Sequence, residues 1–271
     1  MTIYAYVDRG HNKKECEDRI LIGDSILAGG YFEKEADDDL NLLIAVADGV
    51  GGNNGGAYAA GMAVDGIRIL NRKEKLDASD VKNLIENVNQ KILQTSAGNS
   101  SVSNMATTLS GIVMNKETTI LFHIGNTRIY TYKKPYLKKK TNDNTTYNTL
   151  LQSGAITEEQ ASNSRLKSEL DACLGGGDVR YASKLLVEVQ DRIGANKETL
   201  FLCSDGVHDF VSLEELEELL DVNKPYIEIL KDIVHTARKN GSKDDISIII
   251  CEQSKPKFED EADAKSEEES N

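Results

Sequence analysis

Short apolar runs with strand-like composition recur along the chain. They are rich in Val, Ile, Leu, Thr and Tyr, which favour strands, and some are joined by short polar turns such as "NKET", found at 115–118 and again at 196–199. Turns this short connect neighbouring antiparallel strands. The pattern predicts nine strands: Ile3–Val7, Arg19–Ile22, Leu42–Ala47, Thr107–Met114, Thr119–Ile124, Arg128–Lys133, Leu185–Val189, Thr199–Cys203 and Ile246–Cys251.

Segments with helical spacing of apolar residues lie between these strands. The last of them has Pro225 at an early position, which suits a helix start, and apolar residues at Ile227, Leu230, Ile233 and Val234. The predicted helices are Ala57–Asn71, Ser79–Ser96, Glu158–Ser164, Leu213–Leu220 and Pro225–Lys239. Many antiparallel strands with helices gathered outside them indicate an α+β fold, in which helices flank a two-layered sheet core.

Charge and hydropathy exclude several classes of protein. The formal net charge of −13 argues against binding to nucleic acid or to an anionic membrane. The amino terminus meets charge by Asp8, too early for a signal peptide, and no window approaches the roughly 20 apolar residues of a membrane span. We therefore expect a cytoplasmic protein. Residues 1–253 are predicted to form one domain. Residues 254–271 are predicted to be a disordered tail. From Lys255 onward the chain has seven acidic residues and three lysines, with no periodic apolar face that could be buried.

Three groups of residues have simple structural interpretations. The cysteines Cys16, Cys173, Cys203 and Cys251 are isolated, with no Cys-x-x-Cys pair, and are expected to be core thiols rather than disulfides or metal ligands. The lysines 138–140 are expected to be a solvated edge, and the aspartates 37–39 a hydrated loop.

Acidic residues stand at the ends of four predicted strands. They occur in "IAVADGVGG", "LFLCSDG", "SKDDIS" and "CEDRILI" as Asp48, Asp205, Asp244, Asp245, Glu17 and Asp18. Each Asp-Gly pair alone is compatible with a plain turn, and neither phosphate-loop consensus is present. If the strand ends converge, however, so many carboxylates cannot all ionise unless cations offset them. Oxygen ligands select Mg²⁺ or Mn²⁺, and two such ions about 3.5–4 Å apart can clamp a phosphoryl group.

Six motifs in order resemble one known family. "ECED", "VADGVGG", "MATTLSG", "FHIGNTRIY", "LFLCSDGVHD" and "GSKDDISIII" are similar to motifs of the metal-dependent serine/threonine protein phosphatases, the PPM or type 2C family, in its bacterial form. The resemblance runs from Ile3 to Glu252. It implies a four-layer α-β-β-α sandwich of two antiparallel sheets, with two Mn²⁺ or Mg²⁺ ions and a weaker third at one end. It also implies hydrolysis of phosphoserine and phosphothreonine by a metal-bridging hydroxide, without a phospho-enzyme.

Matched position by position, the resemblance also implies the role of each site residue. Asp48 would bridge both ions and Gly49 would lend its carbonyl, while the other ligands would be Asp205, Asp244, Glu17, Asp18 and, for the third ion, Asp209. The partners would be phosphorylated proteins, the substrates of a serine/threonine kinase in a bacterial cytosol, and we expect a monomer.

The sequence departs from the family pattern at three positions. Lys13 stands where the family has a phosphate-gripping Arg, and as a point charge it would hold phosphate less rigidly. Arg9 or Lys14 could substitute for it, or Lys13 could be a solvated charge. Asn126 replaces an Asp, and this change should weaken binding of the third ion but leave the enzyme active. Asp245 replaces an Asn and is expected to face solvent, because Asp is rarely buried without a partner.

Other polar residues near these motifs receive mostly structural interpretations. His11, close to the acid pair, is a candidate general acid, whereas His123 is expected to be a hydrogen-bonded interior residue. Thr107, Thr108 and Cys203 are interpreted as strand packing. Two other functions stay open at this point. One is a catalytically weak regulator that binds a phosphoprotein, and the other is a hydrolase of small phosphate esters.

Overall fold

Two six-stranded antiparallel sheets form the centre of the molecule. The computed structural model describes residues 1–36, 41–50, 55–73, 76–161, 165–177, 184–193 and 198–252. One sheet has the order β11-β10-β14-β15-β1-β4 and the other β13-β9-β8-β5-β2-β3. The strands of the first are β1 (Thr2–Asp8), β4 (Gly30–Glu35), β10 (Arg128–Lys133), β11 (Tyr136–Lys139), β14 (Thr199–Cys203) and β15 (Ile246–Glu252). Those of the second are β2 (Arg19–Ile22), β3 (Ser25–Leu27), β5 (Leu42–Ala47), β8 (Leu109–Met114), β9 (Thr118–Ile124) and β13 (Leu186–Asp191).

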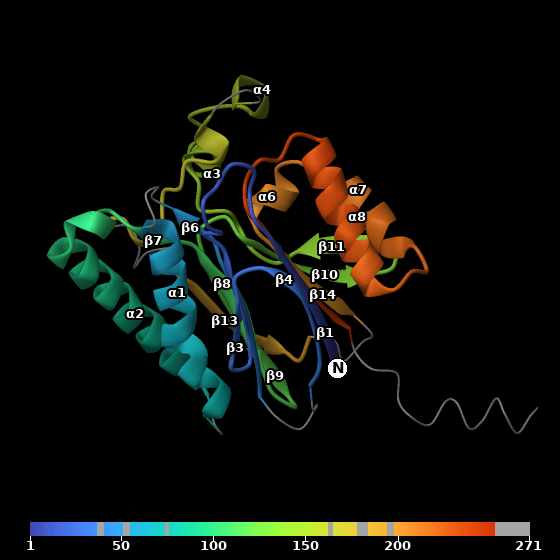
Figure 1. Ribbon diagram of the computed structural model, residues 1–271, viewed down its shortest axis with the longest axis horizontal. Coiled ribbons are helices and arrows are strands. Elements are labelled where there is room, and N and C mark those ends of the chain that lie inside the picture. Colours follow the sequence, from blue (N-terminus) through green and yellow to red (C-terminus); the bar gives the residue numbers. More distant parts are fainter. Residues whose placement is uncertain are drawn as a thin grey trace, which may run out of the picture.

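Helices cover the outer face of each sheet (Figure 1). The helices α1 (Gly55–Ile67) and α2 (Ala78–Gly98) lie against the second sheet, and α7 (Leu213–Asp221) and α8 (Tyr226–Lys239) lie against the first. The smaller elements are β6 (Gly49–Val50), β7 (Ala106–Thr107), β12 (Leu174–Gly175), α3 (Thr146–Gln152), α4 (Glu158–Ala161), α6 (Asp205–His208), η1 (Arg68–Arg72), η2 (Ser100–Val102) and η3 (Arg165–Lys167). The predicted α-β-β-α sandwich is confirmed. Among the described helices, none combines the length and the apolar character needed to span a bilayer.

The apolar run of β5 has no polar face because both of its faces are covered. Leu43 and Ala45 pack into the cluster beneath α1 and α2, whereas Ile44 and Val46 pack into the cluster between the two sheets. Alternate residues of a strand point to opposite faces, so a strand buried on both sides reads as continuously apolar. The buried apolar run ends at Ala47, so Asp48, the next residue, lies at the edge of the core.

The strand registers bring the acidic strand ends to one end of the sandwich. Arg19 pairs with Ala47, so the start of β2 lies beside the end of β5. Cys203 pairs with Ile248, so the end of β14 lies beside the start of β15. The loop from β1 to β2 crosses between the sheets at this same end, because the last residue of β1 pairs with Ile246. Figure 1 places α3, α4 and α6 at this end as well.

Most predicted strands are observed, and three of the strands that were not predicted share a cause. The runs at 19–22, 42–47, 128–133 and 199–203 have the predicted bounds, while the run at 107–114 is divided into β7 and β8 at Thr108. The strands β3, β4 and β11 were not predicted, because short or solvent-facing edge strands have little apolar signal. Of the three lysines at 138–140, Lys138 and Lys139 are exposed on β11, the outermost strand of its sheet, whereas Lys140 follows that strand and is half-buried.

The cysteine prediction is also confirmed, since all four side chains are buried thiols. The aspartates 37–39 and the tail from 253 onward lie outside the described residues.

Candidate functional site

A pocket of about 250 Å³ opens at the end of the sandwich where the acidic strand ends meet. Its lining includes Lys13, Glu17, Asp48, Gly49, Asp205 and Asp244. These residues come from segments up to 231 positions apart in the sequence, Lys13 and Asp244 being the extremes. Six residues proposed from the sequence are therefore brought together. Asp18 is buried directly beside Glu17, with 1% of its surface exposed.

The peptide group of Asp48 is held on both sides by two buried threonines. Its N–H donates to Thr108 Oγ1 at 3.0 Å, while its carbonyl accepts from Thr108 N at 2.9 Å and from Thr107 Oγ1 at 3.0 Å. A further bond of 2.7 Å joins the hydroxyls of Thr108 and Thr127. The interpretation of Thr107 and Thr108 as strand packing was therefore incomplete, because both side chains fix the backbone that carries Asp48.

Two glycines allow the loop after Asp48 to approach helix α1. A Cβ on Gly49 would lie 2.3 Å from the Gly56 carbonyl, and a Cβ on Gly56 would lie 2.6 Å from Glu17 Oε1. Real Cβ atoms do not approach other atoms this closely, so both positions require glycine. The glycine-rich composition here is thus explained in part by backbone packing between β6 and the start of α1.

Burial and mutual repulsion disfavour ionisation of the pocket carboxylates. Burial raises the pKa of Asp48 well above its usual range, and the charges of Asp18, Asp205 and Asp244 raise it further. Burial also raises the pKa of Asp205, with Asp244 adding to the effect. The pKa of Asp18 is raised to about 7 by burial and by Asp245. Within the described part of the chain, neither oxygen of Asp18 has a hydrogen-bond partner. Such a group favours a cation.

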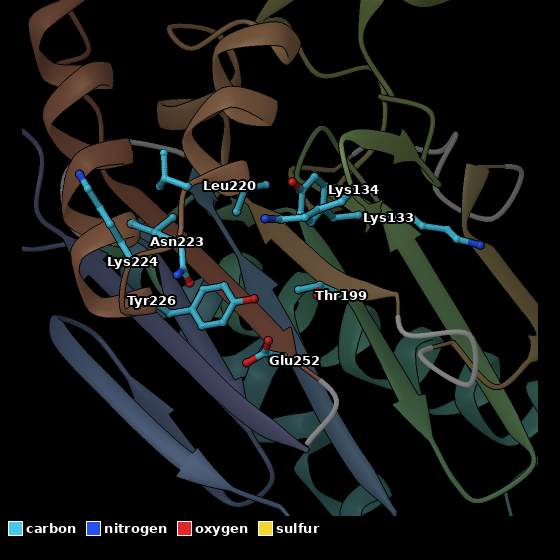
Figure 2. A pocket seen from close by; sticks show the side chains of 11 residues that line it. Lys133, Lys134, Thr199, Leu220, Asn223, Lys224, Tyr226 and Glu252 are labelled. Carbon is cyan, nitrogen blue, oxygen red and sulfur yellow. The ribbon is translucent and has the colours of Figure 1, made fainter. Parts of the chain in front are cut away.

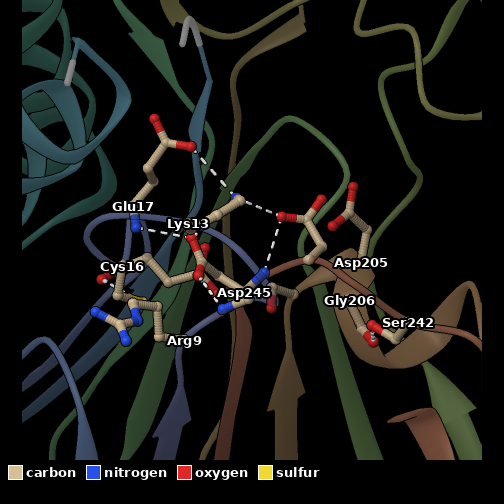
Figure 3. Close-up of polar contacts among 12 residues, drawn as sticks. Arg9, Lys13, Cys16, Glu17, Asp205, Gly206, Ser242 and Asp245 are labelled. Atoms are coloured by element: carbon tan, nitrogen blue, oxygen red, sulfur yellow. Dashed lines mark hydrogen bonds and ion pairs between the residues drawn. The ribbon is translucent and has the colours of Figure 1, made fainter. Parts of the chain in front are cut away.

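Asp245 is buried rather than solvent-facing, which corrects the expectation from sequence (Figure 3). Its Oδ1 accepts from Gly10 N at 2.7 Å and its Oδ2 from Glu17 N at 2.7 Å. Lys13 Nζ lies 3.0 Å from the same Oδ2. Two backbone donors and one cation satisfy a carboxylate that would otherwise be costly to bury. These partners lie more than 200 residues away in the sequence, so no local pattern could predict them.

Asn126 and His208 extend the site on the side of Asp205. The side-chain amide of Asn126 donates to Asp205 Oδ2 at 2.9 Å. His208 Nε2 donates to the carbonyl of Asn126 at 3.0 Å, and its Nδ1 lies 3.1 Å from Asp209 Oδ1. Asp209 is partly exposed and lies outside the pocket lining. The residue at 126 thus contacts a carboxylate of the main pocket as a hydrogen-bond donor.

The other basic residues singled out from the sequence lie outside the pocket lining. His11 is exposed, and its backbone N–H donates to the carbonyl of Lys243. Arg9 is also exposed, and its guanidinium donates to the Lys14 carbonyl at 3.0 Å. His123 is an interior histidine as predicted, since it hydrogen-bonds Ser110 Oγ and the Asn142 carbonyl. Burial lowers the pKa of His123 to about 4.

A different pocket lies beneath α7 and α8 (Figure 2). It is lined by Lys134 and Lys224 among others, but these ammonium groups are paired with Asp221 and Asp232. It contains none of the residues proposed from the sequence. The acidic pocket is therefore the stronger candidate for chemistry.

The family model described as protein phosphatase 2C matches residues 22–249, which is most of the chain. The chain belongs to the protein phosphatase 2C family. A relative, the serine/threonine phosphatase Stp of Listeria monocytogenes, is 29% identical over 255 residues, covering 91% of this chain and 93% of the relative.

Solved structures of serine/threonine phosphatases share the fold. The crystal structure of the Mycobacterium tuberculosis serine/threonine phosphatase PstP has a TM-score of 0.76 at 24% identity, covering 94% of this chain and 100% of that one. A second structure, of the PstP catalytic domain in complex with two manganese ions, has a TM-score of 0.72 at 23% identity and covers 93% and 99% of the two chains.

The donor set of this protein phosphatase 2C chain fits hard divalent ions. All its pocket carboxylates offer oxygen, the ligand that Mg²⁺ and Mn²⁺ prefer, and Asp18 has two buried oxygens without a hydrogen-bond partner in the described residues. As the described side chains stand, no three of the His, Cys, Asp and Glu groups converge on a single point suited to an ion. Lys13 pairs with two of the carboxylates instead, namely Glu17 and Asp244.

Several pocket residues of this protein phosphatase 2C chain were not proposed from the sequence. Val50, Ser168 and Leu170 also line the pocket, as does Asn126, which the sequence had singled out. Ser168 and Leu170 belong to the segment after α4, which has no charged motif and no strong periodicity to single it out. The clamp on Asp48 had a signal, since the "MATTLSG" motif places two threonines at the start of a buried strand.

Proposed function

We propose that this chain is a metal-dependent protein phosphatase that hydrolyses phosphoserine and phosphothreonine in cytoplasmic proteins, acts as a monomer and opposes a serine/threonine kinase. One observation carries the proposal. Asp48, Asp205 and Asp244, from three distant segments, line a single pocket, and burial together with neighbouring carboxylates raises the carboxyl pKa values of Asp48 and Asp205. A buried acid cluster is costly to a fold unless positive charge offsets it.

The proposal gives each acidic residue a role toward two Mn²⁺ or Mg²⁺ ions. Asp48 would bridge them, Gly49 would lend its carbonyl, Asp205 and Asp244 would hold one ion, and Glu17 and Asp18 the other, with Asp209 assigned to a weaker third. When bound, such ions supply an acidified water for attack on phosphorus and positive charge for the phosphoryl oxygens.

The chain itself contributes positioning and electrostatics. The threonine clamp holds the Asp48 N–H and carbonyl by three hydrogen bonds, so the central carboxylate starts from a fixed backbone. Lys13 brings a positive charge into the pocket, where a substrate phosphate would meet it. Val50, which is 42% exposed, and Leu170 provide apolar surface at the pocket for the residues beside the phosphorylated side chain.

Phosphate release from a phosphothreonine peptide tests the proposal. The full chain should release phosphate with Mn²⁺ and stop when the ion is chelated. Asp48→Asn should abolish release, yet it should raise the melting temperature of the chelated protein, because it removes a carboxylate that burial and its neighbours disfavour. Asp65→Asn, an exposed residue of α1, is the matched control and should leave the rate unchanged.

Each competing function has a distinct outcome in this assay. Rapid turnover of p-nitrophenyl phosphate with none on the peptide would indicate a small-ester hydrolase. Tight peptide binding without turnover would indicate a regulator. Full activity of Asp48→Asn, or activity that persists in chelator, would refute the metal-dependent mechanism.

A further inference from the structure

The ammonium group of Lys13 has three carboxylate partners (Figure 3). Its Nζ lies 2.5 Å from Asp244 Oδ1, 3.0 Å from Asp245 Oδ2 and 3.2 Å from Glu17 Oε2. An ammonium group has three N–H donors, so all of its hydrogen-bonding capacity is engaged. A lysine side chain is ordinarily protonated at neutral pH. The side chain is a permanent cation within the acidic pocket.

The three partners differ in how firmly the fold holds them. The Asp245 side chain is 1% exposed and is fixed by two backbone N–H donors, from Gly10 and Glu17. The Asp244 side chain is 48% exposed and accepts a single backbone N–H, from the adjacent Asp245, at 2.8 Å, and the Glu17 side chain is 17% exposed. Lys13 therefore has one buried partner fixed by two distant backbone donors, and two more accessible partners that can exchange it for another cation.

The two exchangeable partners, Asp244 and Glu17, are also proposed ligands of the divalent ions. The proposed function assigns Asp244 and Glu17 to divalent ions, and the present inference rests on that assignment. An ammonium hydrogen and a metal ion use the same carboxylate lone pairs, and two cations at one oxygen also repel one another. An ion and the Lys13 ammonium therefore exclude one another at these oxygens.

We propose that Lys13 is a tethered cation that competes with divalent ions for Asp244 and Glu17, so that ion binding leaves its ammonium paired with Asp245 alone. Lys13 is then a positioning residue. Asp245 keeps the displaced side chain inside the pocket, and because the loop carrying Glu17 is tied to Asp245 by its own backbone, the displacement does not require the loop to move. The simpler interpretation is that Lys13 only neutralises Asp245 and has no effect on ion affinity.

Mn²⁺ affinity of chelator-stripped full-length protein distinguishes the two interpretations. The readout is the electron paramagnetic resonance signal of free Mn²⁺ at fixed pH, which requires no turnover. Lys13→Met removes the ammonium but leaves Asp245 buried and unpaired, so its affinity rises for two reasons at once. The double variant Lys13→Met/Asp245→Asn removes one charge of each sign and keeps the local net charge. Lys14→Met is the control for loss of a nearby exposed positive charge.

Competition predicts a defined order of affinities. The double variant should bind Mn²⁺ about tenfold more tightly than the parent, within the usual range for two mutually exclusive binding events. Lys13→Met should bind more tightly still, Asp245→Asn more weakly than the parent, and Lys14→Met within about twofold of it. A double variant with parental or weaker affinity overturns the inference and leaves the phosphatase proposal intact. Failure of the folded parent itself to bind Mn²⁺ overturns both.

Discussion

Replacing Thr108 by Val tests whether the clamp on Asp48 is a structural requirement of the site. Valine keeps the shape and the β-branched backbone preference of threonine but removes the hydroxyl that accepts from the Asp48 N–H at 3.0 Å. That donor would be left unsatisfied at a cost of about 1–3 kcal/mol. The Thr127 hydroxyl would lose its 2.7 Å partner as well. We expect Thr108→Val to lower the free energy of unfolding by about 2–3 kcal/mol.

Thr107→Val is a matched control on the adjacent residue, which is equally buried. Its hydroxyl lies within hydrogen-bond distance of the Asp48 carbonyl at 3.0 Å and of the Thr108 carbonyl at 2.9 Å, and the Asp48 carbonyl keeps the Thr108 N–H at 2.9 Å. No buried group is orphaned on Asp48, so the loss should be only about 0.5–1.5 kcal/mol. Urea unfolding with an unchanged m-value measures both variants. Equal losses, or a larger loss for Thr107→Val, would refute the assignment of the Asp48 N–H to Thr108.

Three further predictions address backbone packing, pH and charge. Gly56→Ala should lower the melting temperature and weaken Mn²⁺ binding, because the added Cβ would clash with backbone atoms. Gly61→Ala, in the same helix but with open space around the new Cβ, should stabilise the protein by up to about 1 kcal/mol. The reverse order of stabilities would contradict the packing argument. His123 has a folded-state pKa of about 4, below the unfolded value of about 6.5, so the unfolded state binds more protons between these values. Unfolding free energy should therefore fall by up to about 3 kcal/mol as pH drops through that range, and urea titrations of His123→Gln should lack this slope. Asn126→Asp should lower the melting temperature of the protein in chelator, because it places a second carboxylate beside Asp205. It should also enlarge the rise in melting temperature that Mn²⁺ produces. An unchanged rise would count against a role for residue 126 in ion binding.

The central strands could be predicted from the sequence because their signal is local. A run such as β5 is apolar throughout, since both of its faces are buried, and its bounds follow from the residues themselves. The strand β4 (Gly30–Glu35) is the opposite case, since nearly all of it is exposed at a sheet edge and only pairing with β1 makes it a strand. Local composition cannot predict an edge strand that forms only because it pairs with a neighbouring strand.

The candidate site shows the same division. Asp48, Asp205 and Asp244 could be proposed because each follows or precedes a recognisable strand. Asp245 was misjudged because burial of an acid is decided by its partners, here Gly10 and the Lys13 side chain, at the other end of the chain. The identity of one residue does not reveal which distant residues will satisfy its charge.

The carboxylates of the pocket are divided between the two sheets. Asp48 extends from the second sheet, while Asp205 and Asp244 extend from the first. An ion held by both groups would act as a cross-link joining the two halves of the sandwich. The binding energy of the ion would then oppose separation of the two sheets. A substitution that disrupts the apolar layer between the sheets, even far from the pocket, would therefore lower the affinity for the ion.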